Sequence, residues 1–108
     1  MSNVSYSPKA KQDLQEIKKY FEHELKSPSL AKRILQAITQ RIRTLESYPK
    51  SGRKLSALIN METDYRFIGC KGYLAFYRVF DNNVYIVRII HSKRDYVTML
   101  FGDTKLDI

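Results

Sequence analysis

The amino-acid sequence predicts a single α+β domain with the element order β-α-α-β-β-β, in which an N-terminal helix hairpin packs on one face of an antiparallel sheet. Two patterns predict this class: apolar residues recur every three or four positions up to residue 45, and β-branched and aromatic residues dominate after residue 60. The 108 residues suffice for one hydrophobic core but not for two. We therefore expect one domain over residues 4–101 and a C-terminal tail over residues 102–108.

Two helices are predicted from matching start signals. Ser7-Pro8 and Ser27-Pro28 each place an N-cap serine before a proline at the first helical position, where the missing N–H costs nothing. The short turn between the helices predicts an antiparallel hairpin, and a short strand over residues 4–6 precedes it. The two apolar stripes consist of Ala10, Leu14, Ile17, Phe21 and Leu25, then Ala31, Ile34, Leu35, Ile38, Ile42 and Leu45.

Three further strands are expected near residues 65–68, 73–80 and 84–90, with a turn at Asp81-Asn82-Asn83, because asparagine tolerates the positive φ of tight hairpins. A two-residue loop at Asn82-Asn83 would place Tyr77 opposite Arg88. Side chains alternate along strands, so this register predicts one set facing the helices: Leu74, Phe76, Val87 and Ile89. It leaves the other set on the open side: Tyr73, Tyr77 and Arg88.

Charge and cysteine content restrict the class of partner and compartment. Nineteen Lys and Arg residues against 11 Asp and Glu residues give a net charge of +8, which favours nucleic acid or an acidic protein as partner. The single cysteine, Cys70, cannot form an internal disulfide, which favours a reducing compartment. The N-terminus lacks a signal-peptide pattern, and no apolar run is long enough to span a bilayer. We expect a cytoplasmic protein without a membrane partner.

Candidate chemical groups gather in the segment from His91 to Tyr96, directly after an apolar strand. Histidine exchanges protons near neutral pH, arginine can clamp a phosphate, and tyrosine can stack on a base. The alternative is a polar strand end in which Asp95 pairs with Arg94 or caps a following turn. The chain has no Gly-rich phosphate loop, HExxH motif, paired cysteines or serine elbow, so we expect no metal and no cofactor.

Cations elsewhere are candidates for binding a polyanion, although side chains of this kind are more often simply solvated at the surface. Arg66 opens a strand beside Tyr65, and Arg78 and Arg88 lie within strands. Arg88 stands among apolar residues, where a charge is costly without a partner. A basic loop after the second helix carries Lys50, Arg53 and Lys54.

Five segments, in this order, resemble the RelE/ParE toxin superfamily and its ParE-like members in particular. The resemblance covers about residues 4–101. The segments are Tyr6–Leu14, Leu45–Pro49, Tyr65-Arg66, Gly72–Val79 and Val87–Tyr96.

The resemblance implies a toxin that is held inactive by a cognate antitoxin with an acidic or amphipathic C-terminal segment. RelE-like members cleave mRNA on the ribosome, whereas ParE-like members inhibit DNA gyrase. In a nuclease, Arg66 and Arg94 would bind phosphate, and His91 and Tyr96 would supply acid–base or stacking groups. RelE-like nucleases carry an arginine directly after the strand tyrosine, where this chain has Leu74.

The missing arginine and the segment from His91 to Asp95 favour gyrase inhibition. A ribosome-dependent, metal-independent mRNA endoribonuclease remains the alternative, and a non-toxic basic nucleic-acid-binding module is a third hypothesis from another class. In each case the residues expected to contact nucleic acid or a protein partner are Lys50, Arg53, Lys54, Arg66, Tyr73, Tyr77, Arg88, Lys93 and Arg94.

Overall fold

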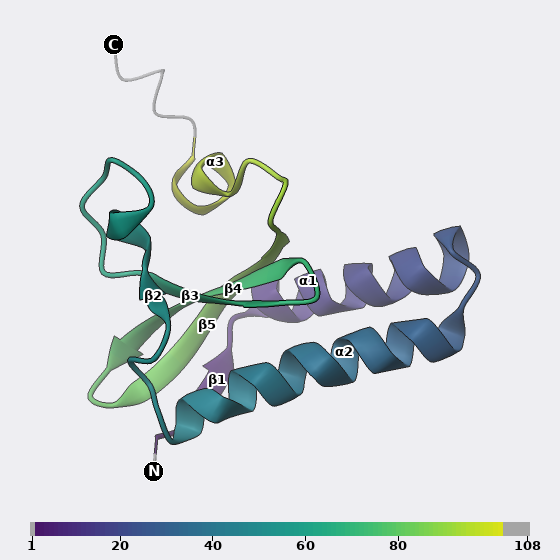
Figure 1. The fold of residues 1–108 in the computed structure, drawn as a ribbon, viewed down its shortest axis with the longest axis horizontal. Helices are drawn as coiled ribbons and strands as arrows, with labels where there is room; N and C mark the ends of the chain where they lie inside the picture. The colour runs from purple at the N-terminus through teal and green to yellow at the C-terminus, as the bar shows by residue number, and fades with distance from the viewer. Residues whose placement is uncertain (1, 103–108) are drawn as a thin grey trace.

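The computed structural model describes residues 2–102, in which two long helices lie side by side on one face of a five-stranded sheet (Figure 1). The strand order is β1-β5-β4-β3-β2. The expected α+β class and helix hairpin are confirmed, but the sheet is mixed because β1 runs parallel to β5. The elements are β1 (Val4–Tyr6), α1 (Pro8–Lys19), α2 (Pro28–Arg43), β2 (Arg53–Lys54), β3 (Arg66–Cys70), β4 (Tyr73–Phe80), β5 (Asn83–His91) and α3 (Tyr96–Phe101).

Both predicted helix starts are confirmed by hydrogen bonds. Ser7 Oγ accepts from the Ala10 N–H at 2.9 Å, and Ser27 Oγ accepts from the Leu30 N–H at 3.2 Å. Each cap satisfies a backbone N–H that has no partner inside its helix. A π-helical turn over Tyr20–Glu24 prolongs α1 to the residue before Leu25, the last residue of its predicted apolar stripe. The two stripes meet the sheet in one core that includes Ala10, Ile17, Ile38, Ile42 and Leu45.

The β4–β5 turn lies one residue earlier than predicted. Its loop consists of Asp81 and Asn82, whose φ angles of 50° and 66° are those of a tight hairpin loop. Further along, Val87 of β5 has no partner on β4. The pairing passes from Tyr77 with Ile86 to Phe76 with Arg88, as in a β-bulge. Arg88 consequently lies opposite Phe76, one residue away from its expected partner.

This one-residue difference exchanges the two faces of β4, because side chains alternate along a strand. Tyr73 and Tyr77 were expected on the open side, but both belong to the helix-side core, and Tyr77 is 0% exposed. Leu74 and Phe76 were expected toward the helices and instead lie in a second cluster on the opposite face. The prediction that Ile89 faces the helices is confirmed.

The second cluster is covered by α3 and by the segment after β2. Asp95 caps α3 by accepting from the Thr98 N–H at 3.3 Å and the Thr98 hydroxyl at 2.8 Å. A cap by Asp95 on a following turn was one of the alternatives for this segment, and the helix α3 was not expected. Of the expected tail, residues 103–108 lie outside the described part of the chain. Between residues 2 and 102, no helix is long and apolar enough to cross a membrane.

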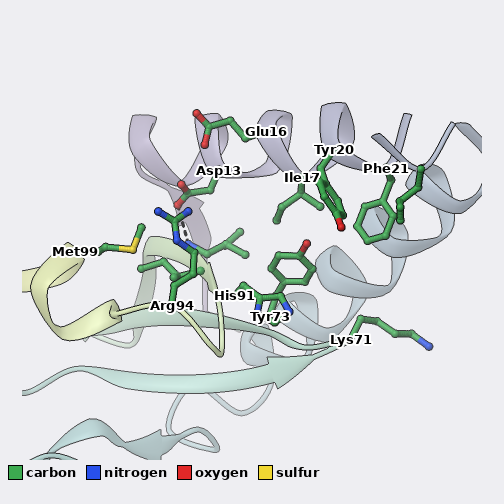
Figure 2. Close-up of a pocket in the computed structure, with 13 residues that line it drawn as sticks. Asp13, Glu16, Ile17, Tyr20, Phe21, Lys71, Tyr73, His91, Arg94 and Met99 are labelled. Atoms are coloured by element: carbon green, nitrogen blue, oxygen red, sulfur yellow. Dashed lines mark hydrogen bonds between the residues drawn. The ribbon is translucent and has the colours of Figure 1, made fainter. Parts of the chain in front are cut away.

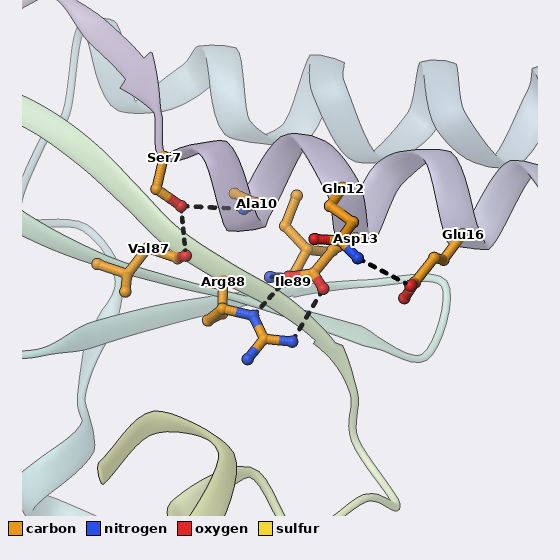
Figure 3. Close-up of polar contacts among 8 residues, drawn as sticks. All are labelled: Ser7, Ala10, Gln12, Asp13, Glu16, Val87, Arg88 and Ile89. Carbon is orange, nitrogen blue, oxygen red and sulfur yellow. Dashed lines mark hydrogen bonds and ion pairs between the residues drawn. The ribbon is translucent and has the colours of Figure 1, made fainter. Parts of the chain in front are cut away.

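The edge of β5 is completed by side chains from α1 where β1 ends (Figure 3). The Ser7 hydroxyl donates to the Val87 carbonyl at 2.7 Å. The buried Asp13 carboxylate accepts from the Ile89 N–H at 2.9 Å and from Arg88 Nε and Nη2 at 2.8 and 2.9 Å. Hydrogen bonds to Asp13 raise the pKa of Arg88. Arg88, expected on the open side, is therefore a buried anchor for α1, because its charge requires a partner.

We predict that Asp13→Ala lowers the free energy of unfolding by about 3–5 kcal/mol, since it leaves a largely buried guanidinium and a strand N–H without their acceptor. Urea unfolding measures this loss. The matched control is Asp64→Ala, which removes an exposed ion pair with Arg78 and should cost no more than about 1 kcal/mol. Equal losses in the two variants would contradict the anchoring role of Asp13.

Candidate functional site

A groove of about 510 Å³ lies between α1 and the C-terminal end of β5 (Figure 2). Three parts of the chain form it: the helix wall, the sheet wall and the segment after β5. Ile17 and Phe21 belong to the helix wall, and Tyr73 and Ile89 belong to the sheet wall. The segment after β5 contributes Arg94 and Met99.

His91 is positioned at the end of β5 by its neighbours. Its Nδ1 accepts from the Lys93 N–H at 3.2 Å, so the proton of the neutral ring belongs on Nε2. The ring meets Tyr73 edge-on, with centroids 5.2 Å apart. Gly72, next to the ring, has a φ of 84°, which favours glycine over residues with a side chain. The imidazole is thus held in one orientation at the groove.

Tyr20 and Leu25 on the helix side and Tyr73 on the sheet side give the groove an apolar rim. Burial raises the pKa of Tyr73, and the nearby Tyr20 raises it further. Tyr73 therefore keeps its proton and offers a hydrogen-bond donor rather than a base. Tyr20 and Leu25 are 49% and 47% exposed, and both line the groove, so they form one exposed apolar surface there. Such surfaces mark sites where another molecule packs.

Charged side chains of both signs line the groove. Lys71, His91 and Arg94 line it on the strand side, and Glu16 lines it on the helix side. Asp13 also reaches it, but its carboxylate already accepts three hydrogen bonds. The groove is therefore suited to a ligand that carries apolar side chains together with carboxylates.

The basic loop lies elsewhere, at the β2 edge of the sheet. Arg66 Nη1 donates to the carbonyls of Lys50 at 3.2 Å and Gly52 at 2.8 Å, and the Tyr77 hydroxyl accepts from the Gly52 N–H at 2.9 Å. A Cβ on Gly52 would collide with that hydroxyl and lie 2.8 Å from the Phe67 carbonyl oxygen. Arg66 and Tyr77 thus hold the loop in place.

The remaining cations of this region are at the surface. Arg53 and Lys54 are both exposed in β2, and the Arg53 guanidinium lies 5.7 Å from the Phe67 ring centre. Lys93 is exposed in the turn after β5.

The structure brings together only some of the residues expected at a site. His91, Arg94 and Tyr73 share the groove. Cys70, which pairs with Tyr73, and Arg66 lie at opposite ends of β3. They are four residues apart, which corresponds to about 13 Å along the strand. Tyr96 packs on the opposite face, with its ring 5.2 Å from that of Phe76. Of the four groups expected in a nuclease, His91 and Arg94 therefore share the groove, and Arg66 and Tyr96 lie outside it. Within residues 2–102, no three His, Cys, Asp or Glu side chains cluster as a metal site would require.

Sequence reasoning missed three contributors to the groove: Tyr20, Lys71 and Met99. It also missed Asp13, for which a signal exists. Asp13 stands three residues after Ala10 and four before Ile17, inside the apolar stripe of α1. A carboxylate at such a position is buried and needs a partner. No local signal marks the other three, because their proximity depends on how α1 and α3 pack on the sheet.

This arrangement, a helix hairpin on a curved sheet with a groove at the end of β5, is the RelE/ParE toxin fold. A structure described as the chromosomal ParDE TA system from P. aeruginosa matches with a TM-score of 0.69 at 22% sequence identity, over 84% of this chain and 96% of that one. The intact E. coli RelBE toxin–antitoxin complex matches with a TM-score of 0.56 at 11% identity, over 87% of this chain and 100% of that one.

Sequence comparison identifies the family. The model described as the ParE toxin of the type II toxin–antitoxin system parDE matches residues 4–96. Toxin RelE3 from Caulobacter vibrioides is 34% identical over 92 residues, which span 85% of this chain and 96% of that protein. The chain belongs to the ParE toxin family, within the RelE/ParE superfamily of type II toxin–antitoxin toxins.

We predict that Tyr77→Phe lowers the free energy of unfolding by about 1–3 kcal/mol, because the buried Gly52 N–H loses its acceptor. Burial also raises the pKa of Tyr77. The folded protein then keeps a proton that the unfolded chain releases, so stability is full below about pH 10 and falls as the pH rises further. Tyr77→Phe should make this alkaline decline shallower. Denaturant unfolding at several pH values measures both effects, and Tyr48→Phe, at a ring that is 69% exposed, is the unaffected control.

Proposed function

We propose that this toxin arrests growth by binding and inhibiting DNA gyrase. The separation of Arg66 and Tyr96 from the groove that holds His91 and Arg94 carries the proposal, since an inhibitor that acts by binding needs no complete set of catalytic groups. Leu74 in place of an arginine agrees with it, and its side chain faces away from the groove. Gyrase is a cytoplasmic target, which suits a chain with one free cysteine.

Purified protein should block DNA supercoiling by gyrase or trap cleaved DNA in a concentration-dependent way. The double variant His91→Ala/Arg94→Ala should still inhibit gyrase, because inhibition by binding requires no acid–base residue. Unimpeded supercoiling at saturating protein would overturn the gyrase proposal. Normal growth of a host that expresses the chain without an antitoxin would instead favour a non-toxic nucleic-acid-binding module.

The second candidate is a ribosome-dependent mRNA endoribonuclease. One observation favours it: His91 and Arg94 line the same groove, where an imidazole and a guanidinium could serve proton transfer and phosphate binding. Primer extension on mRNA from expressing cells distinguishes it, because codon-positioned breaks that the double alanine variant abolishes are expected only from a nuclease.

We further propose that the groove receives the C-terminal segment of a cognate antitoxin. The exposed Tyr20 ring and the Leu25 side chain of its rim would bury against apolar side chains of an amphipathic segment. Lys71 and Arg94 would meet its carboxylates. Solved structures with the same fold come from ParDE and RelBE systems, which supports a partner of this kind.

Tyr20→Ser combined with Leu25→Ser should weaken antitoxin binding at least about tenfold, because large exposed side chains in a groove behave as interface hot spots. The antitoxin used is the product of the short reading frame beside the toxin gene, and calorimetry measures its affinity. Leu58→Ser, at a side chain 45% exposed outside the groove, is the matched control and should bind normally. Equal affinities of all three proteins would place the antitoxin on another surface.

A further inference from the structure

A second exposed aromatic surface lies at the turn end of the β4–β5 hairpin, on the face away from α1 and α2. We define the hairpin patch as Tyr65, Arg78, Phe80 and Tyr85. Arg78 and Tyr85 are cross-strand partners, and Phe80 and Tyr85 are 49% and 38% exposed. Tyr65 also contacts the second cluster, because its ring lies 5.3 Å from that of Phe101 in α3, and the patch therefore adjoins that cluster.

Arg78 is held in one orientation inside the patch. It donates from Nε and Nη2 to both oxygens of Asp64 at 2.9–3.2 Å. Its guanidinium also lies 5.4 Å from the ring centre of Tyr65 and 4.8 Å from that of Phe80. The pair is 36% and 57% exposed, and exposed ion pairs add little to stability, so its main physical effect is to immobilise the arginine between two rings.

The backbone beneath the patch is equally constrained. The loop residues Asp81 and Asn82 both adopt positive φ, which sets a two-residue hairpin with a defined register. A surface that is ordered before binding loses less entropy on association. Exposed aromatic rings with an ordered arginine have the composition of the central residues of protein interfaces.

The charge of the patch distinguishes between two kinds of partner. Arg78 of β4 and Arg53 of β2, which lies over the Phe67 ring, are matched in number by Asp64 and Asp81, although the whole chain carries a net charge of +8. The exposed Asp64 carboxylate, already paired with the guanidinium, would repel a phosphate backbone. A near-neutral aromatic surface is complementary to a near-neutral apolar pocket on a protein.

We propose that the hairpin patch is the surface through which the toxin binds its protein target, by inserting Phe80 and Tyr85 into an apolar pocket. This inference rests on the proposed function, in which the toxin acts by binding. The patch is separate from the antitoxin groove, because Tyr73 and Phe80 lie at opposite ends of β4, about 23 Å apart along the strand. Toxicity and antitoxin binding are then separable by mutation.

The test compares Phe80→Ser/Tyr85→Ser with the wild type and with the control Leu58→Ser. Growth arrest on induction, inhibition of supercoiling by purified protein, and affinity for the product of the neighbouring reading frame are measured for each. The patch variant should lose growth arrest and need at least about tenfold more protein for half-inhibition of gyrase, while its antitoxin affinity stays unchanged. Leu58→Ser should match the wild type in all three.

Growth arrest by the patch variant at the wild-type level overturns the inference and leaves the proposed function standing. If the wild type arrests growth but does not inhibit supercoiling, the gyrase proposal fails, and the patch is judged on growth arrest alone. Should the double variant lack a cooperative melting transition, Tyr85→Ser alone replaces it. Titration with a labelled single-stranded DNA oligonucleotide tests whether the patch binds nucleic acid instead of a protein. Tenfold weaker DNA binding by the patch variant would assign the surface to nucleic acid and overturn the inference.

Discussion

The position of α1 depends on the Asp13 carboxylate at the edge of β5. The strand pairing from β1 ends at Ile86, and beyond it the backbone of β5 would face the helix with unpaired groups. Asp13 accepts from the Ile89 N–H and from two nitrogens of Arg88, so one side chain completes the sheet edge and neutralises a buried cation. Because α1 supplies one wall of the groove, this contact also sets the geometry of the candidate site.

The two surfaces assigned to partners differ in chemistry. The groove combines an apolar rim with Lys71 and Arg94, as an acidic amphipathic segment requires. The hairpin patch is nearly neutral and rests on a rigid turn, as an aromatic anchor for a protein pocket requires. A domain of this size can carry both because the groove and the hairpin patch lie at opposite ends of β4.

Local signals were sufficient to predict much of the fold. The serine caps at Ser7 and Ser27 and the apolar stripes depend on neighbours within a few residues, and each was found where expected. The sequence paired Arg88 of β5 with Tyr77, one residue away from its actual partner Phe76. The bulge at Val87, which shifts this pairing, is not marked by any pattern in the sequence. That difference moved Tyr77 from an expected binding surface to the core, where its hydroxyl holds the basic loop.

By itself the sequence determined the α+β class, the helix hairpin and the toxin superfamily, since these follow from periodicity, capping and short motifs in order. Only the tertiary structure decided which residues share a site. His91 and Arg94 line the groove together with Tyr20 and Lys71. Arg66 lies at the basic loop, and Tyr96 lies in the second cluster. The physical reason is that these neighbourhoods depend on strand register and on the packing angle of α1, both of which arise from contacts between residues more than 70 positions apart, such as Asp13 and Arg88.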